Sequence, residues 1–319
     1  MILILIIPAI YVTCCNIKPN PKIDNNTRFA KRLSFYKLFQ GKPAELIPAP
    51  DVEVLELSST LFTDYAEKQR LIKLPPGKKM KLIGNGLPDF PEGTLIAKTF
   101  YYPLSLAGKL QIIETRLLLL KAGKWHAAVY KWNKEQAEAF LITDGDVVPV
   151  KRLDSNGKMM AIGYHIPANN ECVSCHHSND KILPIGPKAR NLNVEVVRGH
   201  SKVNQLQYLM DKGLMSAEKL NKIDRLPADK NTKIAVDDRA RGYLEINCAH
   251  CHQRGGFAGQ TTLDLNYGTT LDGTGIRLHR NNILIRMSEM GDYHMPKLGT
   301  TMIDTAGLQL IKDYLKKMD

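Results

Sequence analysis

Two copies of the pattern Cys-x-x-Cys-His constrain this chain more than any other feature. They are Cys172, Cys175 and His176 in the stretch NECVSCHHSND, and Cys248, Cys251 and His252 in the stretch INCAHCHQRGG. The chain has 6 cysteines, so these two units use most of them. The fold of this chain must therefore place all three residues of each unit where they can act together.

The histidine directly after the second cysteine sets these units apart from other uses of Cys-x-x-Cys. Disulfides, zinc knots and redox dithiols need no histidine at that position. Cysteines three positions apart on a helical turn face the same way, so both can bond the vinyl groups along one edge of a porphyrin, while the histidine reaches the iron. The sequence therefore predicts two covalently bound haem c groups, with His176 and His252 as iron ligands.

A zinc site built from the four cysteines is the main alternative. The separation between the two pairs far exceeds the roughly 15–20 residues found in common zinc ribbons. A site of four cysteines also leaves both histidines unexplained. Haem is therefore favoured over zinc.

The iron of a c-type haem usually takes a sixth ligand from the protein. For the second unit this ligand is predicted to be Met295 in the stretch YHMPKLGT, because Pro296 stiffens the loop and removes a backbone donor. His294 is the weaker alternative, and the other methionines offered in this stretch, Met287, Met290 and Met302, are expected to pack in the core. For the first unit the spacing ranks no candidate above the others, and these are Met159, Met160, His165, His177, His200, Met210 and Met215. An iron with no sixth protein ligand is also an alternative, and it leaves a position where chemistry could occur.

Composition limits the classes of partner that this chain is expected to bind. The 319 residues carry a formal charge of +12, with 44% hydrophobic and 24% charged residues, which is an ordinary globular balance. Lys and Arg are spread along the whole length without a nucleic-acid motif, so nucleic acid is not an expected partner. A basic redox protein that meets an acidic partner protein explains the charge. Arg277, Arg280 and Arg286 are candidates for pairing with haem propionates.

The first residues, MILILIIPAIYVTCCN, resemble a bacterial export signal peptide. The apolar run is shorter than the roughly 20 residues that span a bilayer. Cys15, with Val12 three positions before it, is the favoured site of lipoprotein-type lipidation, and Cys14 is the alternative. Residues 1–30 are therefore predicted to be an export or lipoprotein signal and tether. This places the protein in the periplasm or cell envelope, held at a membrane by a lipid anchor.

Periodicity predicts an α+β fold for the rest of the chain, which divides into three regions. Residues 31–166 read as a β-rich domain, a meander or sandwich, because six apolar runs from Thr94 on are separated by turn signals. Residues 167–235 read as a helical region that carries the first haem-attachment unit on a short turn at the rim of the β-rich domain. Helices are expected to end at Gly213 and to start at Ser216. Residues 236–319 read as an all-α, class I cytochrome c-like domain with the second haem, closed by an amphipathic terminal helix.

Several motifs, at separate places along the chain, resemble those of a known protein family. They include STLFTDYAEKQRLIKLPPG, IAKTFYYPL, IPANNECVSCH, PIGPKARNLN, ARGYLEINCAHCH and MPKLG. In these the chain resembles a family of exported bacterial dihaem c-type cytochromes, often encoded beside a parallel β-helix protein, over residues 33 to about 315. The resemblance implies two covalent haems and a role in electron transfer. It supplies no substrate and leaves the distal ligand of the first haem undecided.

Two classes of function follow. The leading hypothesis is an electron carrier that relays electrons between redox partners, with His/Met ligation giving the second haem the higher potential. The alternative is a haem oxidoreductase or enzyme subunit, peroxidase-like, with an open first haem. That alternative needs an acid or base over the iron, for which His165 and His200 are the candidates. A third interpretation makes the β-rich domain a docking module for a partner enzyme.

Overall fold

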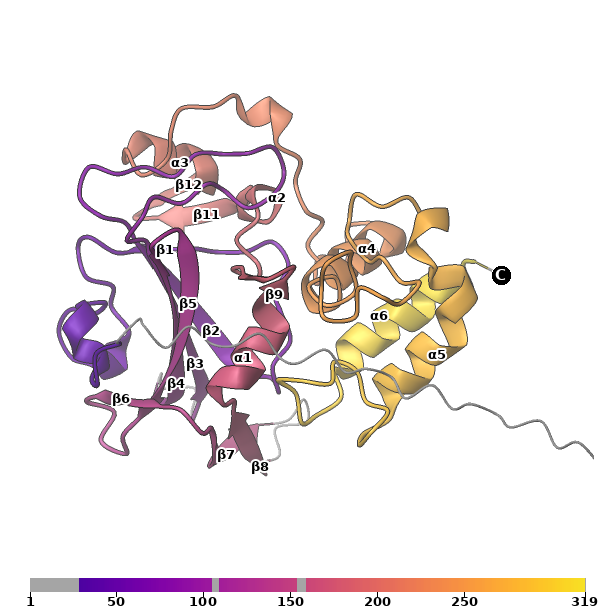
Figure 1. Cartoon of the computed structure of the whole chain (residues 1–319), viewed down its shortest axis with the longest axis horizontal. Helices are drawn as coiled ribbons and strands as arrows, with labels where there is room; N and C mark the ends of the chain where they lie inside the picture. Colours follow the sequence, from indigo (N-terminus) through magenta and orange to yellow (C-terminus); the bar gives the residue numbers. More distant parts are fainter. Residues whose placement is uncertain (1–28, 105–108, 154–158, 319) are drawn as a thin grey trace, which may run out of the picture.

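The computed structural model describes residues 29–104, 109–153 and 159–318. The predicted export signal and both lipidation candidates, Cys14 and Cys15, lie outside these residues. Figure 1 shows a β-rich part built around one large sheet, with a group of helices from the C-terminal part of the chain beside it.

The large sheet is a six-stranded antiparallel meander, in which each strand pairs with the next one along the chain. Its strands are β1 (Glu53–Val54), β2 (Glu67–Lys73), β3 (Leu95–Pro103), β4 (Leu110–Lys121), β5 (Lys124–Trp132) and β6 (Ala139–Ile142). Two 3-10 helices, η1 (Leu33–Tyr36) and η2 (Pro43–Glu45), precede it. The turn between β4 and β5 holds Ala122 at φ 53° and Gly123 at φ 70°, the left-handed conformation that two-residue hairpins favour.

The strands predicted between residues 94 and 166 are all present. Four of the six predicted runs are β3 to β6. The other two are β7 (Asp146–Leu153) and β8 (Met159–Ile166), which pair with each other in a separate two-stranded sheet. Strands β1 and β2 lie before Thr94, where the sequence predicts no individual strand. β2 belongs to the sheet because Leu71 and Ile72 bury their side chains on its opposite faces.

Both faces of the large sheet are covered. Successive side chains of a strand point to opposite faces, so Leu71 and Leu117 pack in one hydrophobic cluster with the N-terminal segment that holds η1 and η2. Ile72 and Leu118 pack in a second cluster on the other face. Burial on both sides explains why β4 reads LQIIETRLLLLK with little alternation of apolar and polar residues.

Short elements from residues 167–235 cover the second face. They are α1 (Asn169–His176), β9 (His177–Ser178), β10 (Lys181–Ile182), α2 (Ala189–Leu192), β11 (Glu195–Arg198), β12 (Ser201–Asn204), α3 (Gln205–Asp211) and η3 (Leu220–Lys222). The prediction of a short turn for the first unit is wrong, because Cys172 and Cys175 lie in a helix, α1, that packs against β5. The helix predicted to end at Gly213 is α3. The helix predicted at Ser216 is wrong, since only η3 forms there.

The predicted all-α cytochrome c-like domain over residues 236–319 is wrong. The described chain is mostly β-rich with six small α-helices, so the fold is not a β domain followed by an all-α domain. The last elements are α4 (Val236–Asn247), η4 (Asp272–Thr274), α5 (Ile276–Ser288) and α6 (Thr305–Lys316). Between α4 and α5 the chain is rich in glycine and threonine, which disfavour a helix. It therefore forms turns, with Gly255 at φ 80° and Gly275 at φ 72°.

The three C-terminal helices share a hydrophobic cluster that includes Leu244, Met287, Ile311 and Leu315. The amphipathic terminal helix is confirmed as α6, which buries Ile311 and Leu315. Among the described residues no helix is long and apolar enough to cross a membrane.

Hydrogen bonds tie the C-terminal segment to the loop between β1 and β2. The Phe62 N–H donates to Asn247 Oδ1 over 2.7 Å, at the end of α4. The Asp64 carboxylate accepts from the backbone N–H of Thr301 at 2.7 Å and of Met302 at 3.0 Å. These bonds bring the second Cys-x-x-Cys-His unit next to the β-rich part that carries the first.

Candidate functional site

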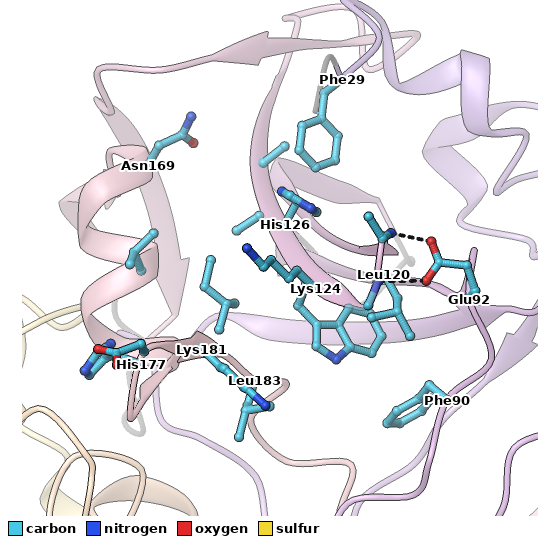
Figure 2. Close-up of a pocket in the computed structure, with 18 of the residues that line it drawn as sticks. Phe29, Phe90, Glu92, Leu120, Lys124, His126, Asn169, His177, Lys181 and Leu183 are labelled. Carbon is cyan, nitrogen blue, oxygen red and sulfur yellow. Dashed lines mark hydrogen bonds between the residues drawn. The ribbon is translucent and has the colours of Figure 1, made fainter. Parts of the chain in front are cut away.

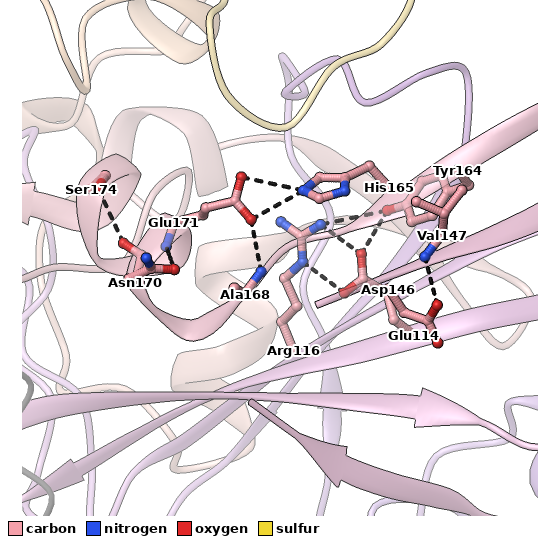
Figure 3. Close-up of polar contacts among 10 residues, drawn as sticks. All are labelled: Glu114, Arg116, Asp146, Val147, Tyr164, His165, Ala168, Asn170, Glu171 and Ser174. Atoms are coloured by element: carbon pink, nitrogen blue, oxygen red, sulfur yellow. Dashed lines mark hydrogen bonds and ion pairs between the residues drawn. The ribbon is translucent and has the colours of Figure 1, made fainter. Parts of the chain in front are cut away.

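The first unit occupies the last two turns of α1. The Glu171 carboxylate accepts the N–H of Ala168 over 2.8 Å and so satisfies a free donor at the start of the helix. The same carboxylate pairs with His165 Nε2 at 3.0 Å (Figure 3). Residues three and four apart share a helix face, so Cys172, Cys175 and His176 line one cavity. The helix therefore presents all three groups of the unit together.

His176 is held in one tautomer. Its Nδ1 lies 2.7 Å from the carbonyl oxygen of Leu183. A carbonyl oxygen only accepts, so Nδ1 must carry the proton and Nε2 keeps a free lone pair. Burial lowers the pKa of His176 to about 4, which keeps the ring neutral. Metal-binding histidines typically donate their second ring N–H to a carbonyl in this way.

The cavity beside α1 is lined mainly by apolar side chains. Its walls include Leu55 and Leu57 from the loop after β1, Leu118 from β4, and the segment 296–300 from the C-terminal part. It encloses about 100 Å³. Burial raises the pKa of the thiols of Cys172 and Cys175 to about 12, so both are protonated thiols at neutral pH.

A row of three cations crosses the floor of this cavity. Arg70, Lys98 and Arg116 lie directly opposite one another on β2, β3 and β4, and all three line the cavity. Arg116 is neutralised by Glu114, with contacts of 2.5 and 3.0 Å (Figure 3). Among the described residues, Arg70 and Lys98 have no ion pair or side-chain hydrogen bond. Burial, together with Arg70, lowers the pKa of Lys98 well below its usual value.

Like charges that face each other across neighbouring strands destabilise a sheet. The apolar residues on either side, Ile96 and Phe100 on β3, show that this face is otherwise a core face. The row therefore favours an anionic group in the cavity, next to the two cysteines of the first unit.

The second unit follows α4 on a single further turn. Cys248 accepts backbone hydrogen bonds from the N–H groups of Cys251 at 3.1 Å and His252 at 2.9 Å. Burial raises the pKa of Cys248 to about 12 and that of Cys251 to about 11. Burial also lowers the pKa of His252, and the charge of Arg286 adds to the shift. The unit thus presents two protonated thiols and a histidine that favours its neutral form.

The Met295 loop is fixed by its neighbours. The Met295 N–H donates to the Arg286 carbonyl over 2.8 Å, which joins the loop to the end of α5. Arg286 is also the residue whose charge lowers the pKa of His252. His294 is only 5% exposed, and its Nδ1 and Nε2 lie 2.7 Å from Glu289 O and 3.1 Å from Thr300 Oγ1. His294 therefore holds the loop and has no ring nitrogen free for iron. Met295 stays the predicted ligand.

The expected core role holds for Met287 but not for Met290, and Met302 is only half-buried. Met287 is 9% exposed and belongs to the C-terminal cluster, as predicted. Met290 is 47% exposed, so its predicted packing is wrong. The three arginine candidates for propionates, Arg277, Arg280 and Arg286, all lie on α5.

The two units meet directly. The Asn179 N–H donates to the Gly255 carbonyl over 2.7 Å, and each residue lies three positions after the histidine of its unit. The Cys251 thiol lies close enough to Cys175 for its charge to raise the pKa of Cys175, although burial is the larger cause. Segments far apart in the chain thus form one composite site.

None of the residues that the sequence offered as sixth ligands for the first unit lines its cavity. Met159 and Met160 are exposed on β8, His165 is paired with Glu171, and His200 is exposed in the turn between β11 and β12. Met210 and Met215 pack in the cluster with α2 and α3. His177 lines a different cavity. The cavity instead contains His250, a spacer residue of the second unit that the sequence analysis does not single out.

A second, larger cavity of about 1300 Å³ lies on the opposite face of α1 (Figure 2). Asn169 and Val173 of α1 line it, together with His177, Trp125 and His126. The cysteines of the first unit do not line it. The cavity is therefore separate from the face of α1 that carries the unit.

Among residues 29–104, 109–153 and 159–318, no group of three or more His, Cys, Asp or Glu side chains is arranged to hold a bare metal ion. Haem iron takes most of its ligands from the porphyrin, so this finding does not concern it. Comparison of the chain with family models, with curated proteins and with solved structures finds no match.

Proposed function

We propose that this chain is an exported dihaem c-type cytochrome that relays electrons between redox partners. The observation that carries the proposal is the contact between the two units through Asn179 and Gly255. Electron exchange between two centres needs them close together, and the fold joins two attachment units that are far apart in the sequence. A chain that needed only two independent cofactors would have no reason to bring them into contact.

The residues present fit a haem c in both units by their donor chemistry. Cys172, Cys175 and His176 would hold the first group, and the second would be held by Cys248, Cys251, His252 and Met295. Haem iron supplies reversible one-electron chemistry when it is bound. The fixed tautomer of His176, with Nε2 free, is the form that an iron ligand requires.

The cationic row of Arg70, Lys98 and Arg116 is independent support for a haem in the first unit. A haem brings two propionate carboxylates, and Arg and Lys bind carboxylates strongly where water is scarce. Lys98 and Arg70 can take up that charge, because Glu114 already occupies Arg116. The row would also hold the porphyrin in one orientation against the large sheet.

The walls of the cavity must move apart when a porphyrin enters. The enclosed space of about 100 Å³ is smaller than the roughly 300–1,000 Å³ of pockets that enclose drug-sized ligands. Two of its walls are loops, the one after β1 and the segment 296–300, and they can shift without breaking a strand or helix.

The partner is proposed to be an acidic redox protein, since the chain carries a net charge of +12. The basic helix α5 lies next to the second unit and carries Arg277, Arg280 and Arg286 but no acidic residue. Export, with a lipid anchor at Cys15 or at Cys14, completes the proposal. The peroxidase-like alternative gains no support from its two acid/base candidates, because neither His165 nor His200 lines the first cavity.

A reductive titration tests the relay. Holoprotein made in a host with the haem-attachment machinery should take up two electrons in separate one-electron steps and pass them to an oxidised acidic cytochrome. It should consume hydrogen peroxide no faster than free haem. Rapid peroxide turnover would replace the relay by the enzyme alternative, and only one redox-active centre would contradict the dihaem proposal itself.

A further inference from the structure

We infer that His250, a spacer residue of the second attachment unit, is the distal iron ligand of the haem held by the first unit. This deepens the proposed function and rests on it, because it needs a haem at Cys172, Cys175 and His176. It fills the position that sequence spacing leaves undecided.

The local backbone turns His250 away from its own unit. The bond from the His252 N–H to the Cys248 carbonyl, at 2.9 Å, makes residues 248–252 one helical turn. At 3.6 residues per turn, His250 lies roughly 200° around the axis from Cys248 and from His252. It therefore faces away from the side on which the second unit presents its thiol and imidazole.

The side to which His250 turns is the cavity of the first unit. His250 lines that cavity together with Cys172, Cys175 and His176. The contact between Asn179 and Gly255 fixes this arrangement, because it locks the segments just after the two units together. One cavity thus holds two imidazoles from two separate attachment units.

His250 also has an unmet need for a partner. Its Nδ1 is buried and makes no hydrogen bond of good geometry among the described residues, although the backbone of Ile246 lies close enough to act on the ring. A buried polar atom without a partner costs about 1–3 kcal/mol, so native structures rarely leave one. A haem iron in this cavity would give the imidazole a partner, because imidazole is a common haem ligand.

The arrangement has a consequence for assembly. His176 of α1 and His250 of the segment after α4 would together hold the first iron, so both would be in place only when the C-terminal segment docks on the loop between β1 and β2. The segment 248–252 would then hold the second haem and also bind the first iron. A movement of this segment would therefore affect both redox centres.

Ferric EPR and optical spectra of the holoprotein test the inference. In the wild type both haems should be low-spin, one with the signature of two histidine ligands and one with His/Met ligation. His250→Ala should convert the first haem to high-spin and leave the second haem unchanged. Added imidazole should restore the low-spin signal, a rescue that a merely structural role would not give. His250→Met should instead give the first haem a thioether-to-iron absorption band.

His126→Ala is the matched control, because His126 lies on the other side of α1 and lines the separate cavity. It should leave both spectra unchanged. A first haem that is high-spin in the wild type, or that stays low-spin in His250→Ala with both haems attached, would overturn the ligand assignment and leave the dihaem assignment standing. Absence of covalent haem would instead remove the proposed function itself.

Discussion

Asn179 and Gly255 are joined by a backbone hydrogen bond of 2.7 Å, and a side chain at Gly255 would collide with Asn179. A Cβ built on Gly255 lies 2.4 Å from Asn179 Oδ1, and the residue has φ +80°. The contact between the two Cys-x-x-Cys-His units therefore depends on a glycine. The close approach of the two units follows from this residue and from the docking of the C-terminal segment on the loop between β1 and β2.

Gly255→Ala should lower the free energy of unfolding by about 1–3 kcal/mol, because it combines a left-handed backbone with a collision. Gly291→Ala is the matched control, with φ +93° and no atom within 4 Å of the new Cβ. It should cost only the backbone strain, about 1–2 kcal/mol. Urea unfolding measures both. Adding Asn179→Ala to Gly255→Ala should recover the difference, and equal losses in the two single variants would refute the contact.

Lys98→Met should lower the midpoint potential of the first haem by on the order of tens of millivolts. A nearby cation favours the reduced iron, which carries one positive charge less, so its removal favours the oxidised form. Spectroelectrochemical titration of the holoprotein measures the shift. Lys121→Met is the control, because Lys121 is exposed at the far end of β4. A potential that does not change in Lys98→Met would mean that the cationic row does not face the haem.

Between pH 7 and about 8, Lys68 should make the apoprotein more stable as the pH rises. Burial, with Arg70 beside it, lowers the pKa of Lys68 to about 7 in the folded chain, from an ordinary value of 10.5. Between these values the unfolded chain binds more protons, so the free energy of unfolding rises with pH, by at most about 1.4 kcal/mol per unit. Urea unfolding at pH 7 and pH 8 measures the slope, below the range in which the free thiols ionise in the unfolded chain and act in the opposite direction. Lys68→Met should flatten it, and an identical slope in that variant would contradict the assignment to Lys68.

The local parts of the structure were predictable from the sequence. Strands β3 to β8 carry their signal within a few residues, as apolar runs between turns, and the two attachment units are local patterns. β1 has only two residues, Glu53 and Val54, and its existence depends on pairing with β2. The all-α prediction for residues 236–319 failed because three helix signals were extended over a long glycine- and threonine-rich segment that forms turns.

The composite character of the site was not predictable in this way. Arg70, Lys98 and Arg116 are far apart in the sequence and align only through the register of three strands. His250 reads as a spacer between two cysteines, and its place in the first cavity depends on the docking of the C-terminal segment. Helical geometry gave one usable signal, since His250 must face away from Cys248 and His252.

Met295→Ala should abolish the weak thioether-to-iron absorption at the red end of the ferric spectrum and lower the potential of the second haem, with both haems still attached. The loop is held by the bond from the Met295 N–H to Arg286, so the effect should be confined to the iron ligand. Met290→Ala is the control, because this methionine is exposed on the same segment. Loss of the band in Met287→Ala, with Met295→Ala unchanged, would reassign the ligand.

The mass of the denatured mature protein, made in a host with the haem-attachment machinery, tests the central claim most directly. The wild type should carry the mass of two haems per chain. The pair of changes Cys172→Ala and Cys175→Ala should remove one haem, and the pair Cys248→Ala and Cys251→Ala should remove the other. A wild-type chain with one haem or none, or with a haem that survives loss of its two cysteines, would contradict the account.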